Sequence, residues 1–398
     1  MPGILFLKPG RDRSVLLRHP WIFSGSVERV EGSPTAGETI EVRASGENKF
    51  LARAAYSPES QIRARIWSWN NDENIDTDFF HRKLSAAIRL RRELFSDPST
   101  NAIRLVHGES DGLPGVIVDQ YDTTLVWQCL FTGAEFWRKE IVDNLVMLTG
   151  CSRVYERSDV DVRVLEGLAQ RTGLLYGEEL TAPVEVLENN LRFKVDLQHG
   201  HKTGFYLDQR RNRQVLKRFV HGRKVLNCFC YSGAFTVYAL AGGAEQVVSV
   251  DSSADALELA KENLHLNNLD ESRAKWEEAD VFEFLRGQRD RAMKYDVIIL
   301  DPPKFAPTIS QAEKAARAYK DINLLAFKLL NPGGYLFTFS CSGGVSAELF
   351  QKIVTGAALD AGVNAKIIDR LYQDEDHPVS LYFPEGAYLK GLICQVGE

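Results

Sequence analysis

The sequence has no apolar run approaching the roughly 18 residues that a membrane-spanning helix requires. Its first residues lack a basic segment followed by a long apolar stretch, so we expect no secretory signal there. Cysteine is scarce, with six residues among 398, and the spacing of these residues matches no disulfide framework. No group of Cys and His residues has the spacing of metal ligands. These absences predict a cytoplasmic protein with reduced thiols, no membrane partner and no metal site.

A large excess of charge of one sign is also missing. The formal net charge is −6, which by itself disfavours a nucleic-acid partner. The charge is unevenly distributed, however: residues 192–224 carry ten Lys and Arg against two acids, and residues 1–70 carry ten against seven. Because a local patch matters more for binding than the total charge, both segments are candidates for RNA contact. A solvated basic face is the plainer interpretation of either one.

What is present is the composition of globular domains, with 44% hydrophobic and 26% charged residues. The length suits two or three domains. Alternating segments such as Gln61–Trp67 predict a small β domain over residues 1–74, which ends in the polar run Asn70–Asn74. A helix is expected from Asp78 to Phe95. Short strands and one more helix follow, and they predict a central, β-rich α+β domain over residues 75–186.

From residue 187 to the end, strands alternate with helices. Such alternation predicts a mostly parallel α/β sheet covered on both faces, with its ligand at the carboxyl ends of the strands. A loop rather than a helix joins the last two strands, so we expect an antiparallel strand at one edge. Five crossover strands and a terminal hairpin are typical of Rossmann-like class I methyltransferases, which use S-adenosylmethionine (SAM). The expected strands are Val225–Phe229, Gln246–Val250, Ala274–Glu278, Asp296–Leu300, Tyr335–Ser340, Ala365–Tyr372 and Tyr388–Val396.

The loop after the first of these strands discriminates between cofactors. It contains one glycine, Gly233, where dinucleotide-binding loops contain three, so NAD and FAD are disfavoured. The polar strand end at Asn227 suits a cationic amino-acid cofactor better. Asp251 follows the second strand, 18 positions after Gly233, and can accept hydrogen bonds from both ribose hydroxyls. Asp280 follows the third strand and can accept from the adenine amino group, although a helix N-cap is the plainer role of a single strand-end aspartate.

Residues at the next two strand ends suggest the reaction. Asp301 opens an Asp-Pro-Pro-Lys sequence, and Lys304 stands where many methyltransferases of exocyclic amines have an aromatic residue. Cys341 ends the fifth strand among Ser and Gly residues. A thiolate that adds to C6 of a pyrimidine makes C5 able to attack a sulfonium methyl group, and Asp301 can act as the acid near N3. The pair predicts methylation of a pyrimidine at C5. The sequence does not identify the base that afterwards removes the C5 proton.

Other roles for the cysteines stay open. A cysteine is more often a small buried apolar residue than a nucleophile. Cys228 and Cys230 lie in the cofactor loop and are rival nucleophiles, although we expect at least one of them to be packed. The remaining three lie in apolar or strand-like segments and are interpreted as structural: Cys129, Cys151 and Cys394.

Several short motifs occur in an order that is specific. They are RHPWIFSG from Arg18, GESDGLPG from Gly108, QHGHKTGFYLDQR from Gln198, NCFCYSG from Asn227, DPPK from Asp301 and FSCS from Phe339. Over the whole chain these motifs resemble the family of bacterial ribosomal RNA large subunit methyltransferase I. The resemblance implies an N-terminal RNA-binding PUA domain, a central β-rich domain, and a SAM-dependent catalytic domain over residues 187–398 that forms 5-methylcytosine in 23S rRNA.

The resemblance also implies roles for residues. It implies that Cys341 is the nucleophile and that Asp251 and Asp280 contact SAM. Together with the strand-end residues, the expected SAM contacts are Tyr206, Asp208, Gln209, Arg210, Asn227, Tyr231, Gly233, Asp251, Asp280 and Asp301. The expected RNA contacts are Lys8, Arg11, Arg13, Arg18, His19, Arg65, Lys202 and Lys304. The expected partner is 23S rRNA or a large-subunit ribosomal precursor, with the target base unstacked from its helix.

Two alternatives are kept. One is a methyltransferase of a guanine nitrogen in rRNA, which needs no covalent thiol and therefore gives Cys341 no role. The other is a non-catalytic RNA-binding assembly factor with a vestigial methyltransferase fold, against which the intact Asp251, Asp280, Asp301 and Cys341 argue. A homodimer is as compatible with the sequence as a monomer.

Overall fold

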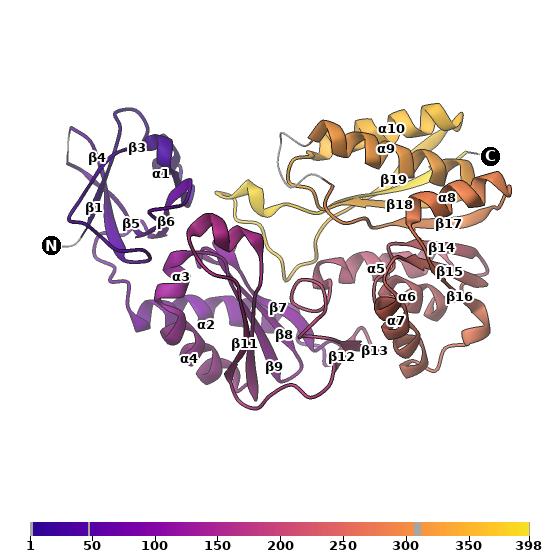
Figure 1. Ribbon diagram of the computed structural model, residues 1–398, viewed down its shortest axis with the longest axis horizontal. Coiled ribbons are helices and arrows are strands. Elements are labelled where there is room, and N and C mark those ends of the chain that lie inside the picture. Colours follow the sequence, from indigo (N-terminus) through magenta and orange to yellow (C-terminus); the bar gives the residue numbers. More distant parts are fainter. Residues whose placement is uncertain (1–2, 47, 306–311, 398) are drawn as a thin grey trace. The chain divides into compact units, whose positions relative to one another are not determined.

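The computed structural model describes residues 3–46, 48–305 and 312–397 (Figure 1). Its contacts divide the chain into two compact units. The first unit comprises Met1–Leu187, Val195–Leu207 and Glu375–Gly386, and the second comprises Glu188–Lys194, Asp208–Asp374 and Ala387–Glu398. The boundaries expected after residues 74 and 186 stay a prediction. In the described part of the chain, no helix is long and apolar enough to span a membrane.

The first sheet of the first unit has six strands in the order β2-β6-β5-β4-β1-β3. β1 and β4 run parallel, and the other neighbours are antiparallel. Alternate side chains, among them Leu5, Val42 and Ile66, form its core, as the alternating sequence pattern predicted. The elements are β1 (Ile4–Leu7), α1 (Arg13–Leu16), β2 (Trp21–Phe23), β3 (Val27–Glu31), β4 (Thr39–Ala44), β5 (Phe50–Tyr56) and β6 (Ile62–Ser68).

The second sheet of the first unit has five strands in the order β11-β10-β9-β8-β7, with three helices. The predicted helix from Asp78 is α2, which the Asp76 side chain caps by accepting a hydrogen bond from the Phe79 amide at 2.9 Å. The elements are α2 (Thr77–Leu94), β7 (Ala102–His107), β8 (Val116–Tyr121), β9 (Thr124–Cys129), α3 (Thr132–Phe136), α4 (Arg138–Thr149), β10 (Arg153–Ser158) and β11 (Arg171–Tyr176). A short two-stranded sheet follows, formed by β12 (Val184–Glu188) and β13 (Leu191–Val195).

The second unit is built on a seven-stranded sheet in the order β16-β15-β14-β17-β18-β20-β19. The first five strands in this order run parallel, and β20 runs antiparallel to both of its neighbours. Its strands are β14 (Lys224–Cys228), β15 (Gln246–Asp251), β16 (Ala274–Glu278), β17 (Tyr295–Leu300), β18 (Leu330–Ser340), β19 (Ala365–Leu371) and β20 (Lys390–Val396). All seven predicted strands are therefore present, and the antiparallel strand lies one position inside the edge, with β19 outermost.

Helices cover both faces of this sheet (Figure 1). One core packs α8, α9 and α10 against the strands, through residues such as Leu285, Ile322 and Phe350. The other packs α5, α6 and α7 against the opposite face, through residues such as Leu216 and Phe235. The helices are α5 (Arg210–Leu216), α6 (Ala234–Ala241), α7 (Ala254–Leu266), α8 (Val281–Asp290), α9 (Ala312–Leu329) and α10 (Ala347–Ala361). This doubly covered parallel sheet is the α/β architecture that the sequence predicted.

Candidate active site

The candidate site lies along one edge of the seven-stranded sheet. In the parallel register, Cys228 of β14 is aligned with Val250 of β15 and with Leu300 of β17, and Leu300 is aligned with Thr338 of β18. The residues that follow these strands therefore share an edge, because the carboxyl ends of parallel strands point the same way. Asp251, Asp301 and Cys341 all lie there, as predicted from their positions in the sequence.

The loop after β14 is held by the Asp251 carboxylate. One oxygen of Asp251 accepts a hydrogen bond of 2.8 Å from the Tyr231 amide, and the other accepts one of 3.1 Å from the Ser253 amide. Phe229 and Tyr231 have φ angles of 60° and 47°, in the left-handed region that costs energy for residues with a side chain. A carboxylate has about four acceptor positions, so Asp251 can organise this loop and still bind a ligand hydroxyl.

Gly233 and Asn227 shape the same loop. A Cβ at Gly233 would lie 2.6 Å from the Cβ of Ala260, so only glycine allows α7 to approach this closely. The Asn227 amide nitrogen donates to Thr236 Oγ1 at 3.0 Å, whereas its buried Oδ1 accepts no hydrogen bond from any described residue. An unsatisfied buried carbonyl is costly, and a cationic amino group would satisfy it. This loop therefore fits SAM, whose methionine part carries such a group.

Asp280 has the plainer of its two expected roles. Its Oδ1 accepts a hydrogen bond of 3.0 Å from the Glu283 amide and so caps α8. The side chain is exposed, and its Oδ2 forms no hydrogen bond with any described residue. Capping does not use the whole carboxylate, so a contact between Asp280 and adenine stays a prediction.

The segment before β14 is buried and tied to the loop that follows β19. The Tyr388 hydroxyl donates to the Asp208 carboxylate at 2.6 Å, and the Arg210 guanidinium donates to the Asp374 carboxylate at 2.7 Å. Gln209 is buried as well and accepts from the Asn212 amide at 2.6 Å. Asp208 and Arg210 thus hold two segments together, and Gln209 contacts its own segment. Contact of all three side chains with SAM stays a prediction.

Tyr206 and Lys202 belong to the first unit. The Lys202 ammonium lies 4.3 Å from the centroid of the Tyr206 ring, within the range of a cation–π interaction. The expected contacts of Tyr206 with SAM and of Lys202 with RNA stay predictions.

Cys341 begins a turn that Lys390 stabilises by hydrogen bonds. The Lys390 ammonium donates hydrogen bonds to the carbonyl oxygens of Ser342 at 2.7 Å and Val345 at 2.8 Å. Burial lowers the pKa of Lys390, while the neighbouring charge of Cys341 acts in the opposite direction. Sequence reasoning missed Lys390 although a signal existed. An antiparallel strand begins at the edge where its parallel neighbours end, so the first residue of β20 belongs to the site.

Two aromatic residues complete the surroundings of this turn. The Tyr319 hydroxyl lies 2.9 Å from Ser342 Oγ and accepts from Ser340 Oγ at 3.0 Å. Burial raises the pKa of Tyr319, and the charge of Cys341 raises it further. The Phe305 ring packs 4.8 Å from that of Tyr319, so an aromatic residue is present one position beyond Lys304. Neither residue had a signal in the sequence, because α9 and the loop after β17 meet only in the fold.

Burial separates the candidate nucleophiles. Cys341 is half-buried, and the other five cysteines are buried. Burial raises the pKa of the Cys228 thiol, and it raises that of the Cys230 thiol with a further contribution from Asp251. Because the thiolate is the reactive form, Cys228 and Cys230 are poor nucleophiles in this structure. Among the described residues, no three His, Cys, Asp or Glu side chains are arranged to hold a metal ion.

Arg65 corrects one of the expected RNA contacts. It is 5% exposed, its guanidinium donates to Glu166 at 2.9 Å, and it lies 4.8 Å from the Phe131 ring. It is therefore a structural residue with no surface to offer RNA. The other expected contacts are exposed, apart from the half-buried His19: Lys8, Arg11, Arg13, Arg18, Lys202 and Lys304.

The basic segment 192–224 is also less available than its charge suggested. Arg213 is buried and donates to the Glu188 carboxylate at 2.6 Å, and the buried Arg210 pairs with Asp374. Lys194 pairs with Glu262 at 2.8 Å. Part of the positive charge of this segment is therefore neutralised within the protein.

Comparison with known proteins agrees with this geometry. The family of S-adenosylmethionine-dependent methyltransferases matches residues 169–378, and a PUA-like domain matches residues 5–69. Ribosomal RNA large subunit methyltransferase I of Tolumonas auensis is 53% identical over 99% of this chain and 100% of its own, and that of Aeromonas hydrophila is 51% identical over the same shares. A solved structure assigned to the SAM-dependent methyltransferases, from Streptococcus mutans, has the same fold over all of both chains, with a TM-score of 0.86 at 22% identity.

The family match covers more than half of the chain, and it includes the loop, strand ends and turn described above. SAM is the cofactor of this family, and the protein is a SAM-dependent methyltransferase. The resemblance seen in the short motifs is thus confirmed over the full length. The chain belongs to the family of ribosomal RNA large subunit methyltransferase I.

Proposed function

We propose that this protein methylates C5 of a cytosine in 23S rRNA, with Cys341 as the covalent nucleophile. The observation that carries the proposal is the placement of a half-buried cysteine at the carboxyl edge of the sheet, directly after β18, which pairs with the β17 strand that precedes Asp301. The name shared by the relatives supports the RNA of the large ribosomal subunit as substrate. Such a substrate, as 23S rRNA or as a large-subunit precursor, implies a cytoplasmic protein.

The chemistry needs few groups from the chain. The Cys341 thiolate adds to C6 of the cytosine, and Asp301 donates a proton at N3 as electron density moves toward C5. SAM, when bound, would supply an electrophilic sulfonium methyl group: C5 bonds to that carbon, and the electron pair of the broken C–S bond stays on the sulfur of S-adenosylhomocysteine. A base then removes the C5 proton, and the electron pair of that C–H bond expels the Cys341 thiolate from C6. N3 returns its proton to Asp301, so the product is neutral 5-methylcytosine and the Cys341 thiolate is regenerated.

Apart from Tyr206, the residues that we expect to hold SAM lie in the second unit. Asn227 offers an unsatisfied carbonyl oxygen, and Asp251 offers acceptor positions for hydroxyl groups. Gly233 leaves space for the loop to close on α7. Tyr231 lies in the same loop and Asp280 follows β16, and we expect both to contact SAM.

The PUA-like domain supports the proposal that the substrate is RNA. Residues 5–69 match that domain, and four expected RNA contacts on it are exposed cations, namely Lys8, Arg11, Arg13 and Arg18. Phosphate contacts supply much of RNA affinity. The target base must also leave its stack before C5 can meet Cys341.

The experiment is incubation with SAM and unmodified 23S rRNA, followed by mass analysis of the nucleosides. We expect 5-methylcytosine with the wild type and with Cys230→Ala, and none with Cys341→Ala. Calorimetry should show that Cys341→Ala still binds SAM, since Cys341 lies in the turn after β18 and not in the cofactor loop.

Survival of methyl transfer in Cys341→Ala contradicts the covalent mechanism. A methylated guanine in that reaction would favour the nitrogen methyltransferase, which needs no thiol. A wild-type protein that binds RNA but neither SAM nor its analogues would favour the non-catalytic assembly factor.

A further inference from the structure

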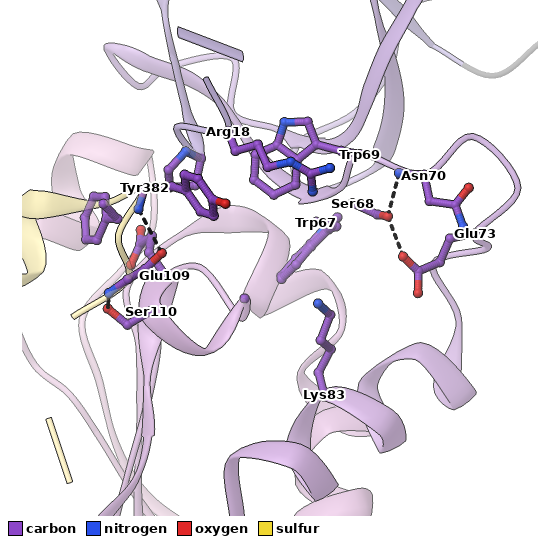
Figure 2. Close-up of a pocket in the computed structure, with 14 residues that line it drawn as sticks. Arg18, Trp67, Ser68, Trp69, Asn70, Glu73, Lys83, Glu109, Ser110 and Tyr382 are labelled. Atoms are coloured by element: carbon purple, nitrogen blue, oxygen red, sulfur yellow. Dashed lines mark hydrogen bonds between the residues drawn. The ribbon is translucent and has the colours of Figure 1, made fainter. Parts of the chain in front are cut away.

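A cavity of about 420 Å³ opens in the first unit, in a place that the proposed reaction does not use (Figure 2). It lies among the end of β6, the beginning of α2 and the segment Ser380–Phe383. Its size is within the range of small-ligand pockets. Its lining includes charged and aromatic side chains, among them Arg18, Trp69, Glu73, Lys83, Glu109 and Tyr382.

Aromatic faces form much of this cavity. The Trp69 indole is half-buried, and its Nε1 donates to the Val15 carbonyl at 3.0 Å, which fixes the plane of the ring. Tyr382 is 54% exposed, a large exposure for an aromatic side chain that lines a cavity. Next to it, Phe383 packs 4.8 Å from the Trp21 ring and anchors the segment. The cavity therefore presents flat, preformed apolar surfaces to solvent.

The acidic and basic residues that line the cavity differ in their contacts with the rest of the protein. Glu73 accepts from Ser68 and from Arg82, and Glu109 accepts from Trp21 Nε1 at 2.7 Å. The cations Arg18 and Lys83, in contrast, form no ion pair with any described residue. Figure 2 shows them approaching the cavity from different sides, Arg18 beside Trp69 and Lys83 from α2. Lys83 still acts electrostatically on Glu73 and lies 5.5 Å from the centroid of the Phe79 ring. Neither cation has an acidic oxygen within about 4 Å in the described part of the chain, so both can approach an anionic ligand.

Arg18 is also held in an unfavourable backbone conformation. Its φ is 62°, and its amide donates to the Val15 carbonyl at 3.0 Å. A residue with a side chain adopts this region at a cost, and such positions are enriched at binding sites. The guanidinium carbon lies 5.8 Å from the centroid of the Trp69 ring, so the strained turn places a cation over the aromatic surface.

We propose that this cavity binds one unstacked nucleotide of single-stranded RNA, with its base against Trp69 and Tyr382 and its phosphates toward Arg18 and Lys83. Bases stack on aromatic side chains whatever their sequence, and phosphates need cations that are not already paired. The inference rests on the proposed function in taking RNA as the substrate. It adds a second RNA-binding site, separate in its residues from the site of methyl transfer.

The test is binding of a fluorescein-labelled single-stranded oligoadenylate of about 12 nucleotides to the full chain, followed by anisotropy at several salt concentrations. Tyr382→Ala should weaken binding about fivefold or more, since one base–aromatic stack is lost. Lys83→Gln should reduce the salt dependence of log K by about 0.7, the value for one phosphate contact on a single strand. An oligomer of abasic ribose phosphates should bind the wild type more weakly.

Two variants serve as matched controls. Tyr176→Ala removes an exposed aromatic residue from β11, and Lys139→Gln removes an exposed cation from α4, both in the first unit. Both should bind the oligomer as the wild type does, and all four variants should keep the wild-type urea unfolding transitions, which verifies folding of the first unit.

Wild-type RNA affinity in both Tyr382→Ala and Lys83→Gln would overturn the proposal, as would equal affinity for the abasic oligomer. An acidic polyglutamate peptide that loses binding in these variants, while RNA does not, would point to a protein partner instead. The proposed function fails separately: absence of 5-methylcytosine in the wild-type reaction leaves the binding result valid. If the variants form 5-methylcytosine normally and their RNA affinity is unchanged, only the proposed nucleotide binding in the cavity is overturned.

Discussion

The ammonium group of Lys390 donates a hydrogen bond of 2.7 Å to the carbonyl oxygen of Ser342, the residue after Cys341. A second bond, to Val345, fixes the same turn. Lys390 therefore does two things at once: it sets the conformation of the turn, and it places a positive charge close enough for Cys341 to affect its titration. The positive charge of Lys304, which follows β17, also acts on Lys390 and lowers its pKa in addition to the effect of burial.

Lys390→Met should slow the reaction of Cys341 with iodoacetamide near neutral pH about tenfold, because a neighbouring cation favours the thiolate. Methyl transfer should slow in parallel, whereas SAM affinity should stay the same. Mass mapping of alkylated peptides gives the rate at Cys341 alone. Lys366→Met, which removes an exposed cation from β19, is the control. An unchanged alkylation rate in Lys390→Met would show that Lys390 has no electrostatic effect on the thiol.

Gly233→Ala should destabilise the second unit and weaken SAM binding. The new methyl group would meet Ala260 Cβ at 2.6 Å, and the φ of 74° adds strain of about 1–3 kcal/mol. Urea unfolding and SAM calorimetry measure the two effects. Gly287→Ala is the matched control, since no atom lies within 4 Å of its new Cβ in α8 and alanine favours a helix. Equal stability of the two variants would contradict the close packing of the loop on α7.

Asp251→Asn should raise the Kd for SAM about tenfold or more. The carboxylate accepts from the amides of Tyr231 and Ser253, and an asparagine has one acceptor oxygen, so its amide nitrogen would face one of these donors. Asp270→Asn makes the same change of charge at an exposed site and should leave the Kd unchanged. Wild-type SAM affinity in Asp251→Asn would remove Asp251 from the cofactor site.

His107 should make the protein lose stability in mild acid. Burial lowers its pKa well below the ordinary value of about 6.5, and His377, Arg104 and Arg91 lower it further. As the pH falls through 6.5, the unfolded chain takes up a proton that the folded chain does not. The free energy of unfolding therefore falls with pH, by at most about 1.4 kcal/mol per unit from this residue.

The check compares urea unfolding of the wild type, His107→Gln and His265→Gln between pH 7 and pH 5. His107→Gln should show a shallower loss of stability than the wild type. His265 is exposed on α7, so its variant should follow the wild type. Identical slopes in all three proteins would assign the acid sensitivity to other groups.

Much of this fold could be predicted because its signals are local. The seven strands of the second unit appear as apolar runs between helical patterns, and strand ends in a parallel sheet must share an edge. Asp251, Asp301 and Cys341 could therefore be grouped from the sequence alone. The position of Gly233 after the first strand likewise identified the cofactor loop.

The residues that were missed, or assigned a wrong role, depend on contacts between distant parts of the chain. Arg65 looks like a surface cation in an alternating strand, yet Glu166 and Phe131 bury it from 101 and 66 positions away. Tyr319 meets the turn after Cys341 only because α9 packs on the sheet. Lys390 was predictable in principle, since it requires only the direction of β20.

The division of the chain has a consequence for recombination and engineering. The chain crosses between the two units five times, after Leu187, Lys194, Leu207, Asp374 and Gly386. A fragment that starts near residue 187 would carry residues 195–207 and 375–386 away from the sheets on which they pack. Exchange of the catalytic unit between relatives as a single cassette would break those same contacts. An exchange would have to match the sequence at all five crossings. We therefore expect the two units to be inherited, and to vary, together.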